Sequence, residues 1–309
     1  MDTTAESAAT LADMASETCI DHNQWRQRGE IIELCGHQMF VIDEGPKDAP
    51  VLLLVHGFPT SSWDFAPMWP TLTGRYRVVA MDMLGFGYSE KPNHRRYTIH
   101  SQADRFEALI RHKQLDQYHV LAHDYGDTVA QEMLARQNHG VGAGRWLSGC
   151  FLNGGLFPET HRALLTQKLL LSPLGGLINR LSGFSQFRKS FTSVFGPNTK
   201  PTDSELKAHW TLINTHDGKH LFHNLMTYIL DRQFNRDRWV KALQKPCCPL
   251  ALINGSVDPV SGAHMVVRYK ELNCQLDYLA ELPQIGHYPQ VEAPDEVARH
   301  YLEFLQAVR

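Results

Sequence analysis

No stretch of this sequence approaches the roughly 18 consecutive apolar residues that a membrane-spanning helix requires. A strong net charge is missing too, because 30 Lys and Arg residues stand against 33 Asp and Glu residues and leave a formal charge of −3 at pH 7. Binding to nucleic acid or to an anionic membrane surface relies on a basic excess, which this chain does not have. We therefore predict that neither nucleic acid nor a membrane is a partner.

Patterns typical of metal sites and disulfides are also lacking. The 17 histidines form no His-Glu-x-x-His or similar ligand spacing, so we expect no metal and no cofactor. The six cysteines include no Cys-x-x-Cys pair, and adjacent cysteines such as Cys247 and Cys248 rarely form a disulfide, so we expect free thiols in a reducing compartment. The segment 1–25 has no Lys or Arg and no apolar core, unlike a secretory signal. These features predict a cytoplasmic protein.

The chain does have ordinary globular composition, with 43% hydrophobic and 20% charged residues over its 309 positions. Strand-like and helix-like patterns alternate along it, which favours an α/β domain with a mostly parallel central sheet and helices on both faces. The strand-like runs lie at 30–34, 38–42, 51–55, 76–81, 118–122, 149–153, 249–253 and 275–279, and the helix-like segments lie at 101–113, 128–137 and 295–308.

This alternation breaks after the sixth strand-like run. Residues 156–245 contain helix-like segments, such as 162–171 and 204–214, with no buried-strand pattern between them. Open α/β sheets bind ligands at the carboxyl ends of their strands, so we expect the inserted segment to form a helical cap over that edge. The predicted organisation is an N-terminal lead at 1–24, a core domain at 25–155 and 246–309, and a cap domain at 156–245.

The segment 123–127 predicts a nucleophile. It follows the apolar run 118–122 and precedes the helical pattern 128–137, which is the strand, sharp turn and helix of a nucleophile elbow. The residue at the turn is Asp124, with small residues two places before and two places after it. A carboxylate has a reference pKa of about 4, is ionised at neutral pH, and can attack an sp3 carbon directly to form an alkyl ester. Asp124 therefore favours hydrolysis of a carbon–oxygen or carbon–halogen bond.

Two later residues complete a predicted catalytic triad with Asp124. Asp258 follows the strand-like run at 249–253, and His287 follows the last strand-like run in a Gly-His-Tyr-Pro segment. Both should lie at the same edge of the sheet as Asp124, in the chain order nucleophile, acid, histidine. We predict that His287 activates water against the ester carbonyl, and that Asp258 orients the imidazole and stabilises its charged form.

The segment His-Gly-Phe-Pro, directly after the buried strand at 51–55, predicts an oxyanion hole. Hydrolysis of the ester passes through an oxyanion, which needs preorganised N–H donors. We assign these to the backbone amides of Phe58 and Tyr125. His56, Trp63 and His123 adjoin the two loops in sequence and are assigned to the substrate pocket.

Asp127 stands three places after the predicted nucleophile. An acid there either raises the pKa of Asp124 or is stabilised by the positive end of the helix dipole. We favour the helix-dipole interpretation.

These motifs resemble the α/β-hydrolase fold family. They are HGFP from His56, DMLGFGYS from Asp82, HDYG from His123 and GH from Gly286. Within that family they are similar to the branch of epoxide hydrolases and haloalkane dehalogenases. Longer stretches, among them HGFPTSSWDF, HDYGDTVAQE and VFGPNTKPTDSEL, resemble the mesoderm-specific transcript proteins and their bacterial relatives, from about Trp25 to the C-terminus. The resemblance implies an α/β-hydrolase fold with a cap, an aspartate nucleophile and the triad, but it does not define a substrate.

The two reactions of that branch differ in the group that leaves. The resemblance implies that a dehalogenase holds the halide with an indole or amide N–H at the positions that Tyr125 and Phe58 occupy here, and neither side chain has such a donor. Trp63 is the one nearby substitute. An epoxide hydrolase instead protonates the leaving oxygen with cap tyrosines. Tyr228 is the only tyrosine between 156 and 245 and resembles the second of these cap tyrosines in its setting, whereas the first has no match; the alternative is that Tyr228 packs in the core.

We therefore predict an epoxide hydrolase that acts on a small hydrophobic molecule, as a monomer or homodimer. The alternatives are a haloalkane dehalogenase, a hydrolase of strained lactones and, least favoured, a binding scaffold without activity. A scaffold of this kind typically loses a member of its triad, whereas all three residues are present.

Overall fold

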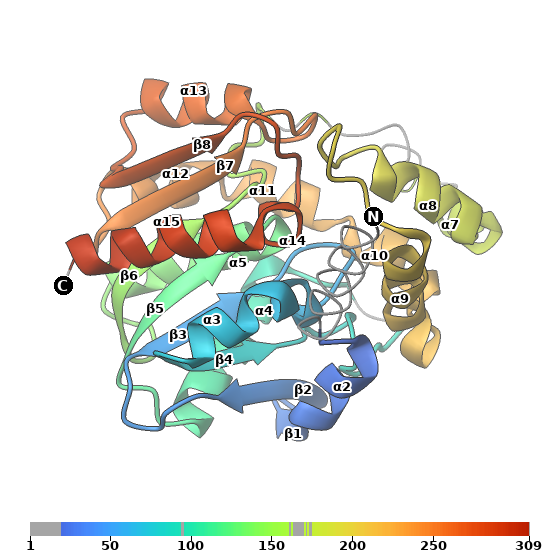
Figure 1. The fold of residues 1–309 in the computed structure, drawn as a ribbon, viewed down its shortest axis with the longest axis horizontal. Coiled ribbons are helices and arrows are strands. Elements are labelled where there is room, and N and C mark those ends of the chain that lie inside the picture. Colours follow the sequence, from blue (N-terminus) through green and yellow to red (C-terminus); the bar gives the residue numbers. More distant parts are fainter. Residues whose placement is uncertain are drawn as a thin grey trace, which may run out of the picture.

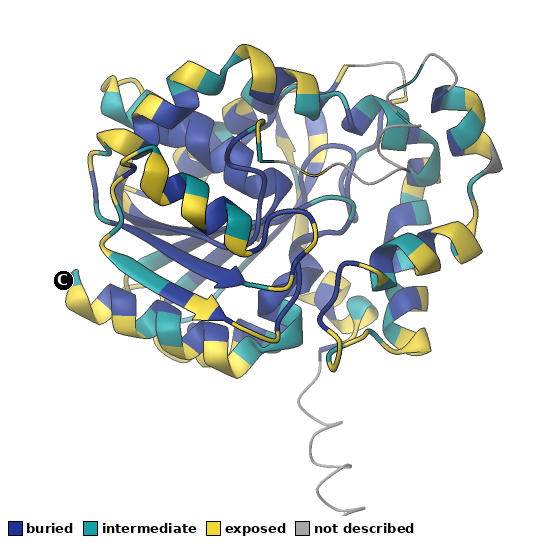
Figure 2. Ribbon diagram, turned by 90° about the horizontal axis from the view of Figure 1, so that it is seen from above, coloured by how far each residue is buried: buried dark blue, intermediate teal, exposed yellow. Residues whose placement is uncertain are grey.

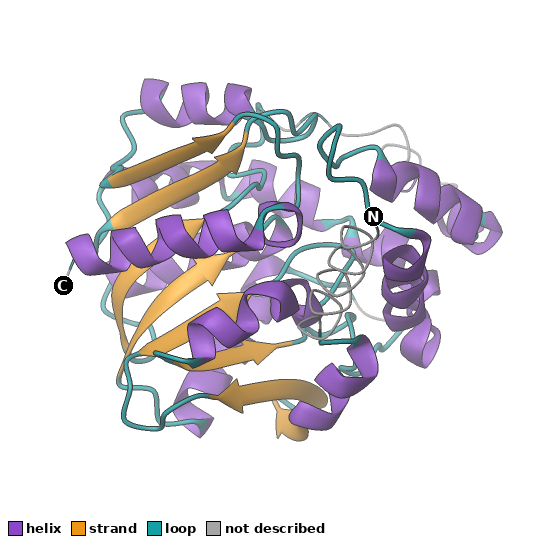
Figure 3. Cartoon of the chain, in the orientation of Figure 1, coloured by secondary structure: helices purple, strands orange, loops and turns teal. Residues whose placement is uncertain are grey.

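An eight-stranded sheet with helices on both faces forms the centre of the molecule (Figures 1 and 3). The computed structural model describes residues 20–93, 96–160, 162, 170, 172 and 175–308. The strands follow one another across the sheet in the order β1-β2-β4-β3-β5-β6-β7-β8. They are β1 (Glu30–Leu34), β2 (His37–Glu44), β3 (Val51–Val55), β4 (Arg77–Met81), β5 (Gln117–Ala122), β6 (Arg145–Phe151), β7 (Leu250–Gly255) and β8 (Tyr278–Leu282). This architecture confirms the predicted fold class.

The direction of the strands changes at one side of the sheet. β1 and β2 form an antiparallel hairpin, and β2 also pairs antiparallel with β4. The two hairpin residues, Cys35 and Gly36, both have positive φ, as the tight turns that match the twist of paired strands require. From β4 to β8 every pair is parallel, so the carboxyl ends of these strands share one edge.

Helices cover both faces of the sheet because its parallel strands present apolar side chains to both. In β3, Leu53 and Val55 pack into one apolar core, and Leu52 and Leu54 pack into the other. Figure 2 shows these strands as buried beneath more exposed helices. The helices of the α/β part are α2 (His22–Arg28), η1 (Ser62–Met68), α3 (Trp69–Thr73), α4 (Ile99–His112), α5 (Tyr125–Asn138), α13 (Ala263–Glu271), α14 (Pro289–Glu292) and α15 (Pro294–Ala307).

Between β6 and β7 the described residues form helices and no strand. We call these helices, α7 to α12, the helical insert. They are α7 (Gly175–Leu181), α8 (Phe184–Thr192), α9 (Asp203–Asn214), η2 (Thr215–Leu221), α10 (Phe222–Leu225), α11 (Tyr228–Phe234) and α12 (Arg236–Gln244). Figure 1 shows α7 to α10 at the right, beyond the carboxyl ends of the parallel strands. Aromatic residues of the insert, including Phe187, Phe191 and Phe195, share a small core with Val260 and Tyr288.

The last helix of the insert, α12, packs against α5 on the face of the sheet. The side chain of Glu132 holds it there by accepting hydrogen bonds from Trp239 at 2.9 Å and from Arg238 at 2.8 Å. At the other side, the ammonium group of Lys91 joins the insert to the core, since it donates to the carbonyls of Gly87 at 2.6 Å and Leu212 at 2.9 Å.

A few predicted elements differ from the observed ones. β8 begins at Tyr278, three residues later than the predicted start at 275; just before it, the carboxylate of Asp277 accepts the amide of Leu250 at 2.8 Å. α5 begins at Tyr125, directly after the elbow residue. Of the helix predicted at 162–171, only 162 and 170 are among the described residues, so the prediction falls outside what the structure describes. None of the described helices is long and apolar enough to span a membrane. Cys247, Cys248 and the other described cysteines are free thiols.

Candidate active site

The elbow between β5 and α5 holds Asp124 in a strained backbone conformation. Its φ is 49° and its ψ is −108°, a region that residues other than glycine rarely adopt. The turn packs closely on β3: a Cβ built on Gly126 would overlap the carbonyl oxygens of Val55 and His56. The absence of a side chain at Gly126 therefore lets the helix start next to the sheet and presents Asp124 at its edge.

The predicted triad residues meet at this edge. Nε2 of His287 lies 3.6 Å from Oδ1 of Asp124, and its Nδ1 lies 2.7 Å from Oδ2 of Asp258. Asp258 follows β7 and His287 follows β8. All three side chains are buried. The geometry thus puts an imidazole between two carboxylates, one in hydrogen-bond contact and one slightly further away.

Asp258 is held as a carboxylate by many donors. Besides the imidazole, it accepts the amide of Val260 at 2.7 Å and the hydroxyl of Ser261 at 2.7 Å. Asn153, which follows β6, donates its side-chain amide to the same carboxylate at 3.0 Å. Burial alone would raise the pKa of Asp258, but the positive charge of His287 and these hydrogen bonds lower it to about 2.

His287 is correspondingly basic. Burial would lower its pKa, but the charges of Asp258 and Asp124 outweigh this effect and raise the pKa to about 9. The imidazole is therefore protonated at neutral pH as long as both aspartates are ionised.

The loop after β3 contacts the other oxygen of the candidate nucleophile. The amide of Phe58 donates to Oδ2 of Asp124 at 3.0 Å. Tyr125 is the first residue of α5, where the backbone amides have no acceptor within the helix. The Phe58 carbonyl in turn accepts the hydroxyl of Tyr288 at 3.0 Å. The Phe58 amide thus contacts the Asp124 carboxylate directly, and the Tyr125 amide directly follows Asp124 in the chain.

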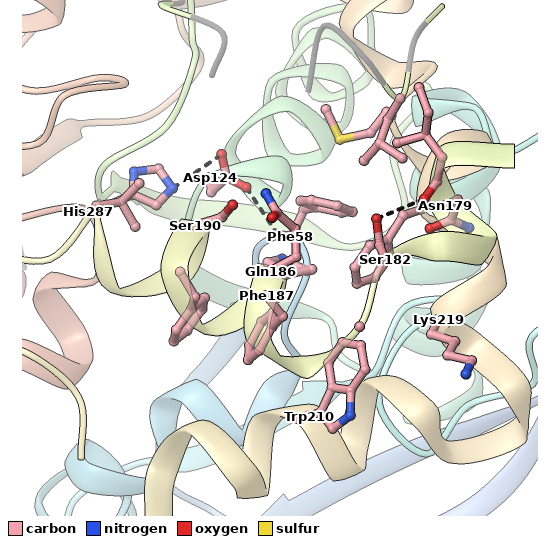
Figure 4. Close-up of a pocket in the computed structure, with 18 of the residues that line it drawn as sticks. Phe58, Asp124, Asn179, Ser182, Gln186, Phe187, Ser190, Trp210, Lys219 and His287 are labelled. Atoms are coloured by element: carbon pink, nitrogen blue, oxygen red, sulfur yellow. Dashed lines mark hydrogen bonds and ion pairs between the residues drawn. The ribbon is translucent and has the colours of Figure 1, made fainter. Parts of the chain in front are cut away.

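A cavity of about 410 Å³ lies above this edge, between the core and the insert. In Figure 4 Asp124, His287 and Phe58 lie together on one side of it, with Ser190 of α8 facing them. Most of the lining side chains are apolar or aromatic. The described residues that line it are Phe58, Pro59, Asp124, Leu170, Ile178, Asn179, Ser182, Gly183, Gln186, Phe187, Ser190, Phe191, Val194, Trp210, Lys219, Phe222, Met226, Val260, His287 and Tyr288.

Three residues that we assigned to the pocket do not line it. His56 is fully buried, with Nδ1 2.8 Å from the carbonyl of Gly57 and Nε2 accepting the amide of Met83 at 2.9 Å. Trp63 donates its indole N–H to the carbonyl of Ile20 at 2.8 Å. The hydrogen bonds of these side chains join the loop after β3 to other segments, and neither side chain lines this cavity.

His123 is the third such residue. Its Nε2 lies 2.7 Å from the carbonyl oxygen of His287, and its ring packs against Tyr288 at 4.9 Å between centroids. Burial, and then the charge of His287, lower its pKa to about 3. His123 is therefore a neutral support for the loop of His287 and does not line the cavity.

The predicted cap acid, Tyr228, also lies outside the lining. Its ring packs against Tyr125 at 4.7 Å and against the guanidinium of Arg232 at 4.5 Å. Burial, and to a lesser extent the charge of Asp124, raise the pKa of its phenol. Tyr288, which directly follows His287 in the sequence, does line the cavity. The sequence motif around His287 does not indicate that the side chain of Tyr288 lines the cavity.

Asp127 lies in the first turn of α5, where the helix-dipole interpretation places it. Its carboxyl is fully buried, and burial, together with the charge of Asp124, raises its pKa well above the usual range. Nearby, the buried Arg232 of α11 donates to the hydroxyl of Thr128 at 2.7 Å and lies 3.4 Å from the carbonyl of Asp124. Arg232 of the insert thus contacts both the elbow residue and the first turn of α5, which no sequence motif indicated.

Comparisons with known proteins agree with this architecture. Residues 50–294 match the family model described as alpha/beta hydrolase fold. The mesoderm-specific transcript protein of Mus musculus is 40% identical over 298 residues, which cover 92% of this chain and 88% of that protein. The putative hydrolase LipZ of Mycobacterium tuberculosis is 36% identical over 282 residues, covering 91% of this chain and 97% of that one.

Two solved structures share the fold at low sequence identity. A haloalkane dehalogenase loop variant from Bradyrhizobium elkanii has a TM-score of 0.77 at 19% identity, and covers 91% of this chain and 96% of its own. A putative epoxide hydrolase from Klebsiella pneumoniae has a TM-score of 0.72 at 16% identity, with coverages of 90% and 97%. Both kinds of enzyme are therefore similar in fold to this chain, and the fold alone does not choose between their reactions.

Proposed function

The chain belongs to the α/β-hydrolase fold family, and we propose that it hydrolyses small apolar substrates through attack of Asp124 on an sp3 carbon, as an epoxide hydrolase does. The observation that carries this proposal is the environment of Asp124. Its carboxylate stands at the wall of an apolar cavity, 3.0 Å from the amide of Phe58 and 3.6 Å from the imidazole of His287. A serine hydrolase has a hydroxyl at this position, which an aspartate does not replace in attack on a carbonyl.

In the first step an oxygen of Asp124 forms a bond to a ring carbon of the epoxide as the carbon–oxygen bond of the ring breaks. The product is an alkyl ester of Asp124 and an alkoxide, which takes up one proton. That proton must come from a donor that reaches the leaving oxygen within the cavity. Tyr228 does not line the cavity. We therefore propose Tyr288 as the donor, because the residue lines the cavity and its hydroxyl donates at 3.0 Å to the Phe58 carbonyl, which is a weaker acceptor than an alkoxide.

In the second step water attacks the carbonyl carbon of the Asp124 ester. The ester carries no charge, so His287 has lost one of the charges that raise its pKa. The imidazole gives its proton, through solvent, to the phenolate that the first step leaves on Tyr288, and in its neutral form it takes a proton from the attacking water. The amides of Phe58 and Tyr125 stabilise the resulting oxyanion. When the oxyanion collapses, the bond to the alkyl oxygen breaks, and that oxygen takes the proton from His287 and leaves as part of the diol. The new carboxylic acid of Asp124 then returns a proton to His287, which restores the ion pair.

The halide reaction is the second candidate and has less support. The indole of Trp63, its nearest donor in sequence, is bound to the carbonyl of Ile20 at 2.8 Å. Trp210 does line the cavity, but Figure 4 shows it away from Asp124. Neither indole is placed to hold a halide that leaves from a carbon attached to Asp124.

A His287→Ala variant tests the proposal, because the ester should accumulate when its base is missing. The variant is incubated separately with epoxides, haloalkanes and β-lactones, and its intact mass is measured. An epoxide adds its whole mass, whereas a haloalkane adds its mass less hydrogen halide. Peptide mapping should place the adduct on Asp124, and the matched Asp124→Ala/His287→Ala variant should form none. No adduct from any panel would contradict the proposal.

A matched pair of variants tests the proton donor. Tyr288→Phe should slow adduct formation from epoxides by about a hundredfold or more, the size typical of a lost general acid. Tyr228→Phe removes the same hydroxyl outside the cavity and should change that rate far less. The reverse ranking would assign the donor to Tyr228.

A further inference from the structure

The cavity has a polar region on the side away from the candidate nucleophile. Asn179 and Ser182 come from α7 and the turn after it, and Lys219 comes from η2, which packs against α7. We call these three residues the distal patch. In Figure 4 they lie opposite Asp124 and His287, with the aromatic side chains of the lining between the two ends. The substrate cavity is therefore apolar in its middle and polar at both ends.

Asn179 has an unsatisfied polar atom in this patch. The residue is 2% exposed, and its Oδ1 has no hydrogen-bond partner among the described residues. Its Nδ2 lies 3.4 Å from Nδ1 of His223, a long contact. A buried polar atom without a partner is rare in proteins and calls for an explanation such as an absent ligand.

Lys219 is the second unusual member. It is half-buried and lines the cavity, and within the described residues it makes no hydrogen bond or ion pair. Asp124 is the only carboxylate among the described lining residues, and it lies at the other end. The distal patch thus has an ammonium group with no ion-pair partner among the described residues.

We propose that the substrate carries a carboxylate at the end of an apolar chain, and that Lys219 and Asn179 bind it while the electrophilic carbon reaches Asp124. This inference rests on the proposed function. An ammonium group and an amide N–H both donate to a carboxylate. The amide of Asn179 can turn its NH2 toward the cavity, because His223 can present either a donor or an acceptor at Nδ1 according to its tautomer.

The apolar middle of the cavity and its polar distal patch contribute differently to substrate binding. The aromatic wall favours a chain of methylene groups by removing apolar surface from water. The distal patch then sets the register of that chain, so that one carbon along it stands against Asp124. A substrate without the carboxylate would bind in several registers and present the reactive carbon less often.

Binding of unreactive probes tests the inference without any catalysis. The affinities of the full chain for straight-chain carboxylates of 6 to 12 carbons and for the matching alcohols are measured by calorimetry. Lys219→Met, which keeps the length of the side chain and removes its charge, should reduce the preference for carboxylate over alcohol by about tenfold, as expected when one charge-assisted hydrogen bond is lost. Lys219→Arg should retain most of the preference. Lys270→Met, the same change on the exposed face of α13, is the control and should match the wild type.

Asn179→Asp is a second variant for this test, because it keeps the shape of the side chain and adds a negative charge to the patch. It should weaken carboxylate binding more than alcohol binding. If Lys219→Met and Asn179→Asp both leave the preference unchanged, or if the wild type shows no preference, the inference is overturned.

A reactive pair separates this inference from the proposed function. The His287→Ala variant is treated with a terminal epoxide that carries a carboxylate, 7,8-epoxyoctanoate, and with uncharged 1,2-epoxyoctane. Faster adduct formation from the carboxylate, lost on Lys219→Met, supports both proposals. An adduct from both epoxides at equal rates overturns the distal patch alone. No adduct from either contradicts the proposed function, and the calorimetry still decides the inference.

Discussion

Replacing Asp124 with asparagine should lower the pKa of His287. The two side chains face one another, with Oδ1 3.6 Å from Nε2. Asparagine keeps the shape of the side chain and removes its charge, as formation of the alkyl ester would. The variant therefore isolates the change that the proposed mechanism requires between its two steps.

The size of the effect follows from the environment of the imidazole. His287 has a pKa of about 9, against an ordinary value of 6.5, even though burial acts in the opposite direction. That rise corresponds to about 3 kcal/mol of differential interaction. Asp258, in hydrogen-bond contact at 2.7 Å, supplies the larger part and Asp124 the smaller. We expect Asp124→Asn to lower the pKa by about one unit, which is about 1.4 kcal/mol.

The lower pKa of His287 in Asp124→Asn should also weaken the pH dependence of the protein's stability. A histidine whose pKa is raised on folding stabilises the protein fully below pH 6.5, and this contribution is lost as pH rises toward 9. The Asp124→Asn variant should lose less free energy of unfolding between pH 6 and pH 9 than the wild type. Urea denaturation at the two pH values measures the difference.

NMR titration of ¹⁵N-labelled histidine side chains measures the pKa directly. Asp127→Asn is the matched control, because it makes the same change nearby, whereas the carboxylates that raise the pKa of His287 are Asp258, Asp124 and Glu292. A pKa of His287 that stays the same or rises in Asp124→Asn would refute the electrostatic coupling, and with it the change of His287 from ion-pair partner to base.

Other substitutions test the packing around the site. Gly126→Ala should lower the free energy of unfolding by about 3 kcal/mol and abolish turnover, because its Cβ would overlap backbone oxygens of β3, whereas Gly183→Ala, where a Cβ meets open space, should be tolerated in urea denaturation. Asp127→Asn should stabilise the protein more at pH 7 than at pH 4, since a carboxyl whose pKa is raised on folding loses stability as pH rises above its unfolded value. Lys91→Met should cost about 3 kcal/mol by leaving three carbonyl groups without their donor, and exposed Lys241→Met should cost little in the same assay.

The residues at strand ends could be predicted from the sequence because local patterns determine them. A buried strand, a sharp turn with Gly126 and a helix specify the elbow around Asp124, and the order of the later strands places Asp258 and His287 at the same edge. Parallel strands end at one edge of a sheet whatever the details of packing, so the meeting of these three side chains needed no knowledge of the insert.

Side-chain direction and the cavity wall depended on tertiary structure. His56 and Trp63 lie next to the predicted loops in sequence, yet the backbone turns both side chains away from the cavity toward partners that are distant in the chain. Tyr228 shares the elbow's surroundings, but it packs beneath the site and not in the cavity.

Sequence alone therefore determined the fold class and the meeting of Asp124, Asp258 and His287 at one edge. Hydrophobic periodicity identifies each strand from neighbouring residues, and the parallel strands then bring their carboxyl ends to the same edge of the sheet. Only the tertiary structure decided which residues enclose the substrate. Asn179 and Lys219 come from helices whose sequences show no motif, and their place in one cavity lining depends on how the insert packs over the sheet. Contacts of this kind join segments far apart in the chain, and no local pattern encodes them.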